Sequence, residues 1–189
     1  TVDLLYHSLT DTIPGVRPYT HTDEADVSTA EPTVGKSTEP PTLRVGDVVT
    51  YNLVFTVPAG TVGMGGDSYL KDTLPAGVWY ITDSETLDWT PSGVGTISYT
   101  NRTVAVIADS QVVTWTFGTP ITSLQDVATV VTLTFQAQAT GEDAEDDDPW
   151  LQDGEPHTTT NTVELVQRGD SKGTDTAENV VRQPDLDIA

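Results

Sequence analysis

The alternation of apolar and polar residues in short segments is the feature that most limits how this chain can fold. Between Val49 and Val57, apolar residues hold every second position and Thr50, Asn52 and Thr56 lie between them. A period of two places alternate side chains on opposite faces of a strand, so this segment predicts a long strand with one buried face. No stretch of helical length has a convincing 3.6-residue apolar period, so little helix is expected.

Similar segments recur along the chain with turn-forming residues between them, as in Pro75-Ala-Gly77. The further expected strands cover residues 69–74, 78–81, 95–99, 103–107, 112–117, 127–139 and 160–165. The turn formers, 15 Gly and 12 Pro, are spread along the whole chain rather than pooled. Many short strands with regular turns predict an all-β fold of two packed antiparallel sheets, a β-sandwich.

Charge and cysteine content exclude several functions. The 29 acidic and 8 basic residues give a net charge of −21, which repels nucleic acid and anionic membranes. The chain has no Cys, so disulfides, Cys-ligated metals and thiol catalysis are excluded. No apolar run is long enough to span a bilayer, and the first residues lack the basic start of a signal peptide. We therefore expect an excised or processed extracellular segment, with any export signal outside it.

The two ends of the chain resemble each other. Residues 1–6 (TVDLLY) match residues 162–167 (TVELVQ). Further along, Thr22 and Glu24 match Thr176 and Glu178. The period is roughly 155 residues, the size of one domain. We interpret residues 1–31 as the closing strands and linker of a preceding repeat, 32–182 as one complete domain, and 183–189 as the start of the next. Chance similarity between two acidic β segments is the alternative.

Four motifs follow one another in residues 32–182. They are Val34-Gly-Lys36, Gly46-Asp-Val-Val-Thr-Tyr51, Lys71-Asp-Thr-Leu-Pro-Ala-Gly77 and Thr160-Asn-Thr-Val163. Each alone is weak, because Gly-Asp and Pro-Ala-Gly are ordinary turn sequences. In this order they resemble the immunoglobulin-like repeats of bacterial cell-surface and fimbrial adhesins, including the collagen-adhesin (CnaA-type) isopeptide domains. The resemblance implies an immunoglobulin-like antiparallel β-sandwich.

The resemblance also implies an amide bond that the domain forms by itself between Lys36 and Asn161, promoted by Asp72. Burial among aromatic residues such as Tyr51, Trp79 and Phe135 would favour a neutral Lys36 amine and a protonated Asp72. Because each group would act once, this is maturation chemistry and the chain is not expected to be an enzyme. In the alternative, Asp72 bonds backbone amides, Asn161 lies in a strand-end turn and Lys36 is a solvated surface lysine.

Other motifs offer weaker candidates. The acidic run at 142–148, with Asp146, Asp147 and Asp148, supplies hard oxygen ligands for Ca²⁺ but lacks calcium-loop spacing, so a solvated loop is favoured and no cofactor is expected. Trp89 and Trp150, both expected in loops, are candidates for carbohydrate contact, whereas Trp79 and Trp115 are expected in the core. Arg168-Gly-Asp170 matches an integrin-recognition tripeptide but equally suits a hairpin turn.

Together these features predict a structural spacer of an extracellular tandem-repeat protein, either an adhesin or a fimbria-like fibre. Its expected partners are neighbouring repeats of the same polypeptide, with a host or matrix surface reached through other domains. The alternative is an adhesive module that binds glycan or calcium. The similar chain ends favour the spacer, because domains that follow one another head to tail require the same connection between neighbours more than they require the same ligand-binding loops.

Overall fold

The computed structural model describes residues 2–7, 18–23, 30–61, 67–140 and 156–182. The chain divides into two compact units, Thr1–Ala30 and Glu31–Ala189. In the first unit, β1 (Val2–His7) and β2 (Pro18–Asp23) form an antiparallel two-stranded sheet. None of the described helical segments is long and apolar enough to cross a bilayer.

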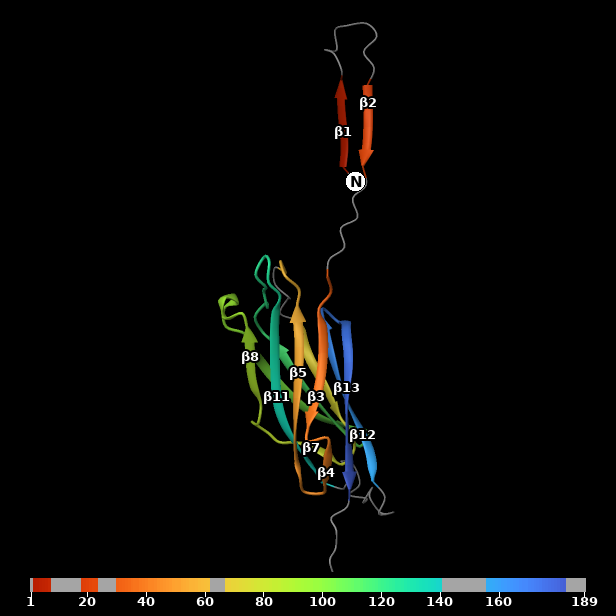
Figure 1. Cartoon of the computed structure of the whole chain (residues 1–189), viewed down its shortest axis with the longest axis vertical. Helices are drawn as coiled ribbons and strands as arrows, with labels where there is room; N and C mark the ends of the chain where they lie inside the picture. Colours follow the sequence, from red (N-terminus) through yellow and green to blue (C-terminus); the bar gives the residue numbers. More distant parts are fainter. Residues whose placement is uncertain (1, 8–17, 24–29, 62–66, 141–155, 183–189) are drawn as a thin grey trace, which may run out of the picture. The chain divides into compact units, whose positions relative to one another are not determined.

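The second unit is a sandwich of two sheets (Figure 1), which confirms the predicted all-β, immunoglobulin-like fold class. Its strands, in chain order, are β3 (Thr33–Glu39), β4 (Thr42–Arg44), β5 (Val48–Val57), β6 (Ser68–Leu74), β7 (Val78–Tyr80), β8 (Thr86–Thr90), β9 (Tyr99–Ile107), β10 (Ser110–Phe117), β11 (Thr129–Ala139), β12 (His157–Gln167) and β13 (Asp170–Arg182). A 3₁₀ turn, η1 (Ser92–Val94), follows β8.

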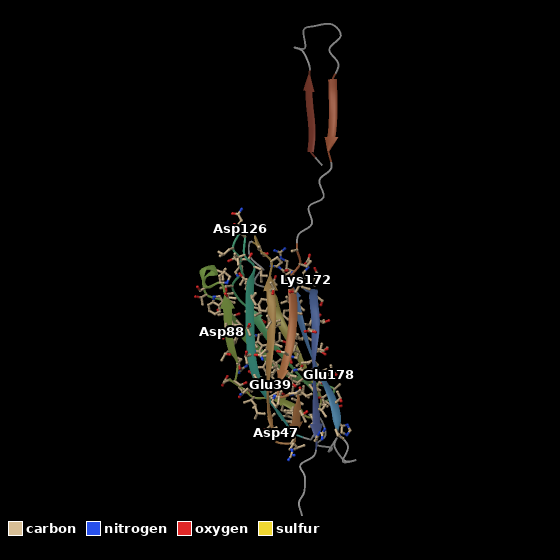
Figure 2. The ribbon with its side chains drawn as sticks, viewed as in Figure 1. Glu39, Asp47, Asp88, Asp126, Lys172 and Glu178 are labelled. Atoms are coloured by element: carbon tan, nitrogen blue, oxygen red, sulfur yellow. The ribbon has the colours of Figure 1, made fainter. Side chains whose placement is uncertain are left out.

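One sheet has six strands in the order β4-β13-β12-β6-β10-β9, antiparallel throughout except for the parallel pair β4 and β13. The other has the order β3-β5-β11-β7, and β8 also pairs with β11. Apolar side chains from both inner faces form one core between the sheets. The largest fully buried side chains are Trp115, Tyr51, Phe55, Phe117 and Phe135. Charged side chains such as Glu39, Asp88 and Glu178 lie on the outside (Figure 2).

The closing part of the domain differs from the prediction. The expected last strand at 160–165 is the middle of β12, and β13 follows it around a two-residue turn. Arg168 and Gly169 both have positive φ, 55° and 83°, as a tight hairpin turn requires. The Arg168-Gly-Asp170 tripeptide is therefore the turn between β12 and β13, and Asn161 lies on the penultimate strand of the domain rather than on the last.

Two other expectations were wrong. Trp79 is 38% exposed, because β7 turns Val78 and Tyr80 inward and so points Trp79 outward. In Val78-Trp-Tyr-Ile81 both faces of the strand are apolar, so the sequence did not reveal which one faces the core. Residues 95–98 are not a strand, and the chain follows an irregular path from η1 to the start of β9.

Candidate functional site

Lys36 enters the core from β3. It pairs with Leu53 on β5, whose side chain is completely buried, and paired residues in an antiparallel sheet point to the same face. The Lys36 side chain is itself fully buried, and its Nζ contacts Oδ2 of Asp72. The alternative of a solvated surface lysine is thereby excluded.

Asp72 reaches the same space from β6 in the opposite sheet. In this strand Ser68, Leu70, Asp72 and Leu74 point inward in strict alternation, and Asp72 is fully buried. Its neighbour Lys71 points outward, as strand alternation predicts, and its Nζ lies 3.2 Å from Oε2 of Glu164. Lys71 is therefore excluded as a partner for the buried groups.

Asn161 lies on β12, the strand next to β6. Asp72 pairs with Val163, so Asn161 is the diagonal neighbour of Asp72 on the same inner face. Asn161 is completely buried, yet neither its Oδ1 nor its Nδ2 has a hydrogen-bond partner among the described residues. Oδ1 of Asp72 is likewise without a partner in this part of the chain. A buried polar atom without a partner costs roughly 1–3 kcal/mol, so each needs an explanation.

Aromatic rings enclose this group of three, here called the buried Lys-Asp-Asn centre. Lys36 Nζ lies 4.8 Å from the ring centroid of Tyr51 and 5.7 Å from that of Phe135. Trp115 packs on Phe135 with their ring centroids 5.2 Å apart. The expected aromatic surroundings are thus present in Tyr51 and Phe135, whereas Trp79, which was expected among them, points outward.

Burial sets the protonation of the centre. It lowers the pKa of the Lys36 ammonium, although the nearby Asp72 carboxylate acts in the opposite direction. Burial also raises the pKa of Asp72, against the opposing effect of Lys36 and a smaller one of the Asn161 carboxamide, which lies close to Asp72 but without the geometry of a full hydrogen bond. Both shifts favour a neutral amine beside a neutral carboxylic acid, the pairing that a nucleophile and a proton donor require.

A second buried asparagine, Asn179 on β13, was not anticipated from the sequence. Its Oδ1 accepts a hydrogen bond from the Tyr51 hydroxyl at 2.7 Å, and its Nδ2 donates to Thr38 Oγ1 and to the Pro40 carbonyl, both at 3.0 Å. Nearby, the Lys36 backbone N–H donates to Oδ2 of Asp175 at 2.7 Å. The sequence gives little indication that Asn179 is buried, because the surrounding segment is acidic and its apolar residues do not alternate strictly.

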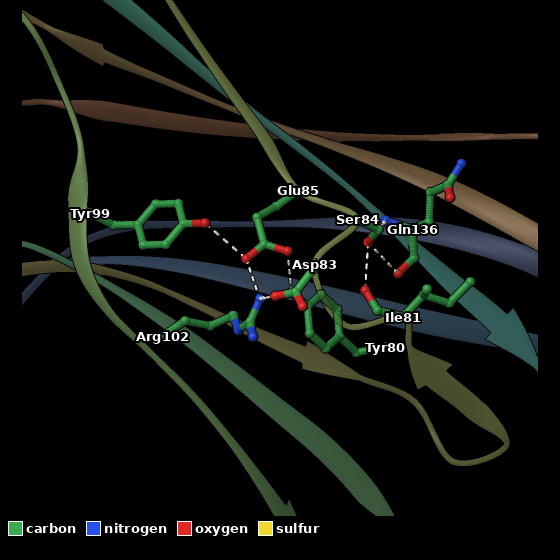
Figure 3. Close-up of polar contacts among 8 residues, drawn as sticks. All are labelled: Tyr80, Ile81, Asp83, Ser84, Glu85, Tyr99, Arg102 and Gln136. Carbon is green, nitrogen blue, oxygen red and sulfur yellow. Dashed lines mark hydrogen bonds and ion pairs between the residues drawn. The ribbon is translucent and has the colours of Figure 1, made fainter.

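A separate polar cluster joins β9 to the segment between β7 and β8 (Figure 3). Oε1 of Glu85 accepts hydrogen bonds from Tyr99 at 2.9 Å and from Arg102, and its Oε2 accepts one from Tyr80. Arg102 also lies 3.0 Å from Oδ1 of the exposed Asp83. With every group paired, this cluster connects the edges of the two sheets and leaves no group free for chemistry.

The other candidate residues are not brought together with the centre. Trp89 lies on strand β8, not in a loop as expected, and packs partly against the core beside an open hollow of about 360 Å³ lined by Asp88, Ser92, Gly95 and Thr96. Trp150 and the acidic residues Asp146, Asp147 and Asp148 lie outside the described residues. Among those that are described, no group of His, Asp or Glu side chains is arranged to hold a metal ion.

No protein-family model matches the chain, and no curated protein matches it. Its fold is similar to several solved structures. The pilus backbone protein RrgB of Streptococcus pneumoniae is 14% identical with a TM-score of 0.48, covering 75% of this chain and 32% of that one. The Corynebacterium diphtheriae major pilin SpaA, whose structure is said to point to a modular pilus assembly stabilizing isopeptide bonds, is 17% identical with a TM-score of 0.49, covering 85% of this chain and 37% of that one.

BcpA, the major pilin subunit of Bacillus cereus, is 13% identical with a TM-score of 0.46, covering 97% of this chain and 48% of that one. The chain therefore spans about a third to a half of the length of these three structures. All three are described as pilus proteins.

Proposed function

We propose that this chain is an extracellular spacer module that bears mechanical load, and that its domain is closed by an amide bond between Lys36 and Asn161. The observation that supports the proposal is the buried Lys-Asp-Asn centre. A lysine, an aspartate and an asparagine with unpaired carboxamide atoms are enclosed by aromatic rings between two sheets. A domain gains little stability from such a set unless the groups react, because an unreacted buried ion pair and unpaired amide both carry desolvation costs.

The chemistry follows from the protonation that burial favours. The neutral Nζ of Lys36 attacks Cγ of Asn161, while protonated Asp72 donates a hydrogen bond to the carboxamide oxygen and stabilises its developing charge. One C–N bond forms and one breaks. Asp72 passes its proton to the departing nitrogen and takes up the proton that leaves Nζ, and ammonia is released. Asp72 returns to its starting state, each chain reacts once, and no cofactor is required.

A bond at this place would join β3 of one sheet to β12 of the other. The two sheets, otherwise held by side-chain packing, would become covalently connected across the core. We also propose that residues 1–31 close a preceding copy of the domain. The antiparallel β1–β2 pair supports this reading, since β12 and β13, which these two strands resemble in sequence, are also an antiparallel pair, and a two-stranded sheet alone is marginally stable. The spacer role, extracellular location and lack of enzymatic turnover belong to the same proposal.

Intact-mass spectrometry of the folded chain tests the bond. The chain should be lighter than its sequence by one ammonia, and peptide mapping should recover Lys36 linked to Asn161. Lys36→Ala, Asn161→Ala and Asp72→Ala should each restore the full mass. Asn179→Ala is the matched control, because it removes a buried asparagine that already has hydrogen-bond partners, and it should retain the loss of ammonia.

Two outcomes would contradict the bond. A wild-type chain at its full mass would show that the centre stays unreacted. Loss of water in place of ammonia would show that Lys36 has joined Asp72, the side chain it contacts directly, with Asn161 as a bystander.

The alternative function, an adhesive module, has one observation in its favour, the hollow beside Trp89. An indole next to hydroxyl groups can stack on a sugar ring and bond its hydroxyls. Glycan-array binding that is lost in Trp89→Ala but kept in Trp79→Ala, the exposed tryptophan with no described hollow beside it, would favour this module over the spacer. Calcium binding at Asp146–Asp148 stays a proposal, tested by a saturable, calcium-specific rise in melting temperature.

A further inference from the structure

Strand β9 leaves one long edge of the six-stranded sheet unprotected. In the described part of the chain it has a strand neighbour on one side only, β10, with which it forms a hairpin. The opposite row of backbone N–H and C=O groups therefore faces outward. At the other end of the same sheet the edge strand, β4, is only three residues long.

The side chains along β9 make this edge unusual. All five residues from Thr103 to Ile107 are exposed, and Val104, Val106 and Ile107 are 44%, 51% and 59% exposed. Val104 and Val106 point to the inner side of the sheet, because they pair with the buried Val113 and Gln111 on β10. They therefore form an apolar rim that nothing described covers.

Features that normally protect an edge strand are missing here. Proteins guard such edges with lysine, proline, bulges or charged side chains. Residues 103–107 contain none of these side chains, and the bulge in the β9–β10 ladder lies at the other end, near Thr116 and Phe117. The one charged residue of β9, Arg102, is held by Glu85 and Asp83.

The distribution of charge favours a second copy of this chain as the partner of this edge. The chain carries a net charge of −21, so two copies repel each other over most of their surfaces. From residue 99 to residue 108 there is no acidic residue, and a second copy would bring the same neutral apolar edge to the contact. We propose that β9 pairs with β9 of a second copy of this chain, forming a symmetric dimer with one sheet continued across both copies.

The exposed segment fixes the register. A twofold axis at Ala105, the middle of residues 103–107, pairs Ala105 with its counterpart and Val104 with Val106 of the second copy. The four valines then cover one another on the inner side of the joined sheet, as apolar cross-strand pairs do. Such an association is independent of the buried Lys-Asp-Asn centre, and in a spacer it would hold neighbouring fibres side by side.

Cysteine cross-linking tests this register, and the chain supports a clean design because it has no Cys. In Ala105→Cys the two sulfur-bearing residues face each other across the axis, with Cα atoms about 4.5–5.5 Å apart, inside the range for a disulfide. In Thr103→Cys, equally exposed on the same strand, the two cysteines are four residues out of register, about 13 Å apart. Mild oxidation should convert most of the Ala105→Cys protein, but little of the Thr103→Cys protein, into a covalent dimer.

Sedimentation of the unmodified chain gives a second readout. Because self-repulsion opposes pairing, the dimer fraction should rise with NaCl as the Debye length falls from about 10 Å at 0.1 M to about 3 Å at 1 M. Val106→Lys should abolish the dimer at high salt, whereas Val127→Lys, at a 49% exposed valine in a loop, should leave it intact. A chain that stays monomeric at high salt, or equal cross-linking of the two cysteine variants, would overturn the proposal.

Discussion

Asn161 and Asn179 are both buried, yet their surroundings are opposite. Asn179 bonds Tyr51, Thr38 and the Pro40 carbonyl, whereas the carboxamide of Asn161 has no described partner. A buried amide with full hydrogen bonding contributes to stability, and one without partners lowers it. The same residue type thus has a structural role on β13 and, by the proposal above, a chemical one on β12.

This contrast predicts unequal costs for removing the two asparagines when no bond can form. In a Lys36→Met/Asp72→Leu background, Asn161→Leu should leave the free energy of unfolding unchanged or raise it. Asn179→Leu should lower it by about 1–3 kcal/mol for each partner left unpaired, chiefly the Tyr51 hydroxyl and the Pro40 carbonyl. Urea denaturation measures both values. Equal costs would mean that Asn161 has a structural partner after all.

The Lys36–Asp72 contact predicts a pH dependence in a chain that cannot form the bond. In an Asn161→Ala background, Lys36→Met leaves the carboxyl group of Asp72 buried with no amine beside it, so folding near neutral pH must either bury its charge or protonate it, at a cost of roughly 3–5 kcal/mol. Burial raises the pKa of Asp72, and removing Lys36 removes the main opposing effect, so the folded state prefers the protonated acid. The penalty is full above the raised pKa and is relieved as the pH falls toward about 3.9, the unfolded value.

The free energy of unfolding of this variant should therefore rise as the pH is lowered from neutral toward about 4, which urea titrations at several pH values would detect. Adding Asp72→Leu should restore much of the lost stability and remove the rise. If the rise persists without the carboxyl group, another residue is titrating.

At the scale of the strands, the sequence predicted most where one face is polar. The strict alternation of β5 identified both the strand and its inner face, whereas the burial of Asp72 on β6 was expected from the family resemblance. Prediction failed where both faces are apolar, as at Trp79, and where alternation is incomplete, as in β13. Because β13 was missed, so was Asn179, and Asn161 was assigned to the last strand. Periodicity shows which face of a strand is buried. It does not show which side chain of the opposite sheet that face contacts, because this depends on the tertiary fold.

The cluster around Glu85 connects the edges of the two sheets and predicts how the fold responds to acid. Burial acts to raise the pKa of Glu85, but hydrogen bonds from Tyr80, its own backbone amide, Tyr99 and Arg102 outweigh burial and lower it. A carboxyl group with a lowered pKa contributes stability that is present above its unfolded value, about 4.3, and is lost as the pH falls through the folded value.

Glu85→Gln should lower the free energy of unfolding at neutral pH by about 1.5–3 kcal/mol, because charged acceptors form the stronger hydrogen bonds. It should also reduce the loss of stability that the wild type undergoes below about pH 4. Asp83→Asn is the control, since Asp83 contacts the same Arg102 but is 82% exposed and should contribute at most about 1 kcal/mol. Equal effects of the two variants would contradict a special role for the buried carboxylate.

For the whole domain, a bond between Lys36 and Asn161 would close a loop of more than 100 residues. By analogy with a disulfide, a loop of about 100 residues restricts the unfolded chain by roughly 4.7 kcal/mol. Residues 37–160 would lie inside this loop, protected from extension. The β12–β13 hairpin, from residue 162 to residue 182, would lie outside it.

Because Asn161 lies on the penultimate strand, the bond would make most of the domain a closed ring with short free ends. The ring cannot be extended by force, and only the free ends can lengthen, by a limited amount. Pulled from residues 31 and 182, the linked chain should lengthen only by straightening the residues outside the ring, 31–35 and 162–182, by at most about 90 Å. Single-molecule force spectroscopy should record this small step in the wild type and a several-fold longer one in Asn161→Ala, where the whole domain can unravel. A long step in the wild type would mean that the ring is open, and a fibre of such modules would then stretch rather than absorb a pull in small, reversible increments.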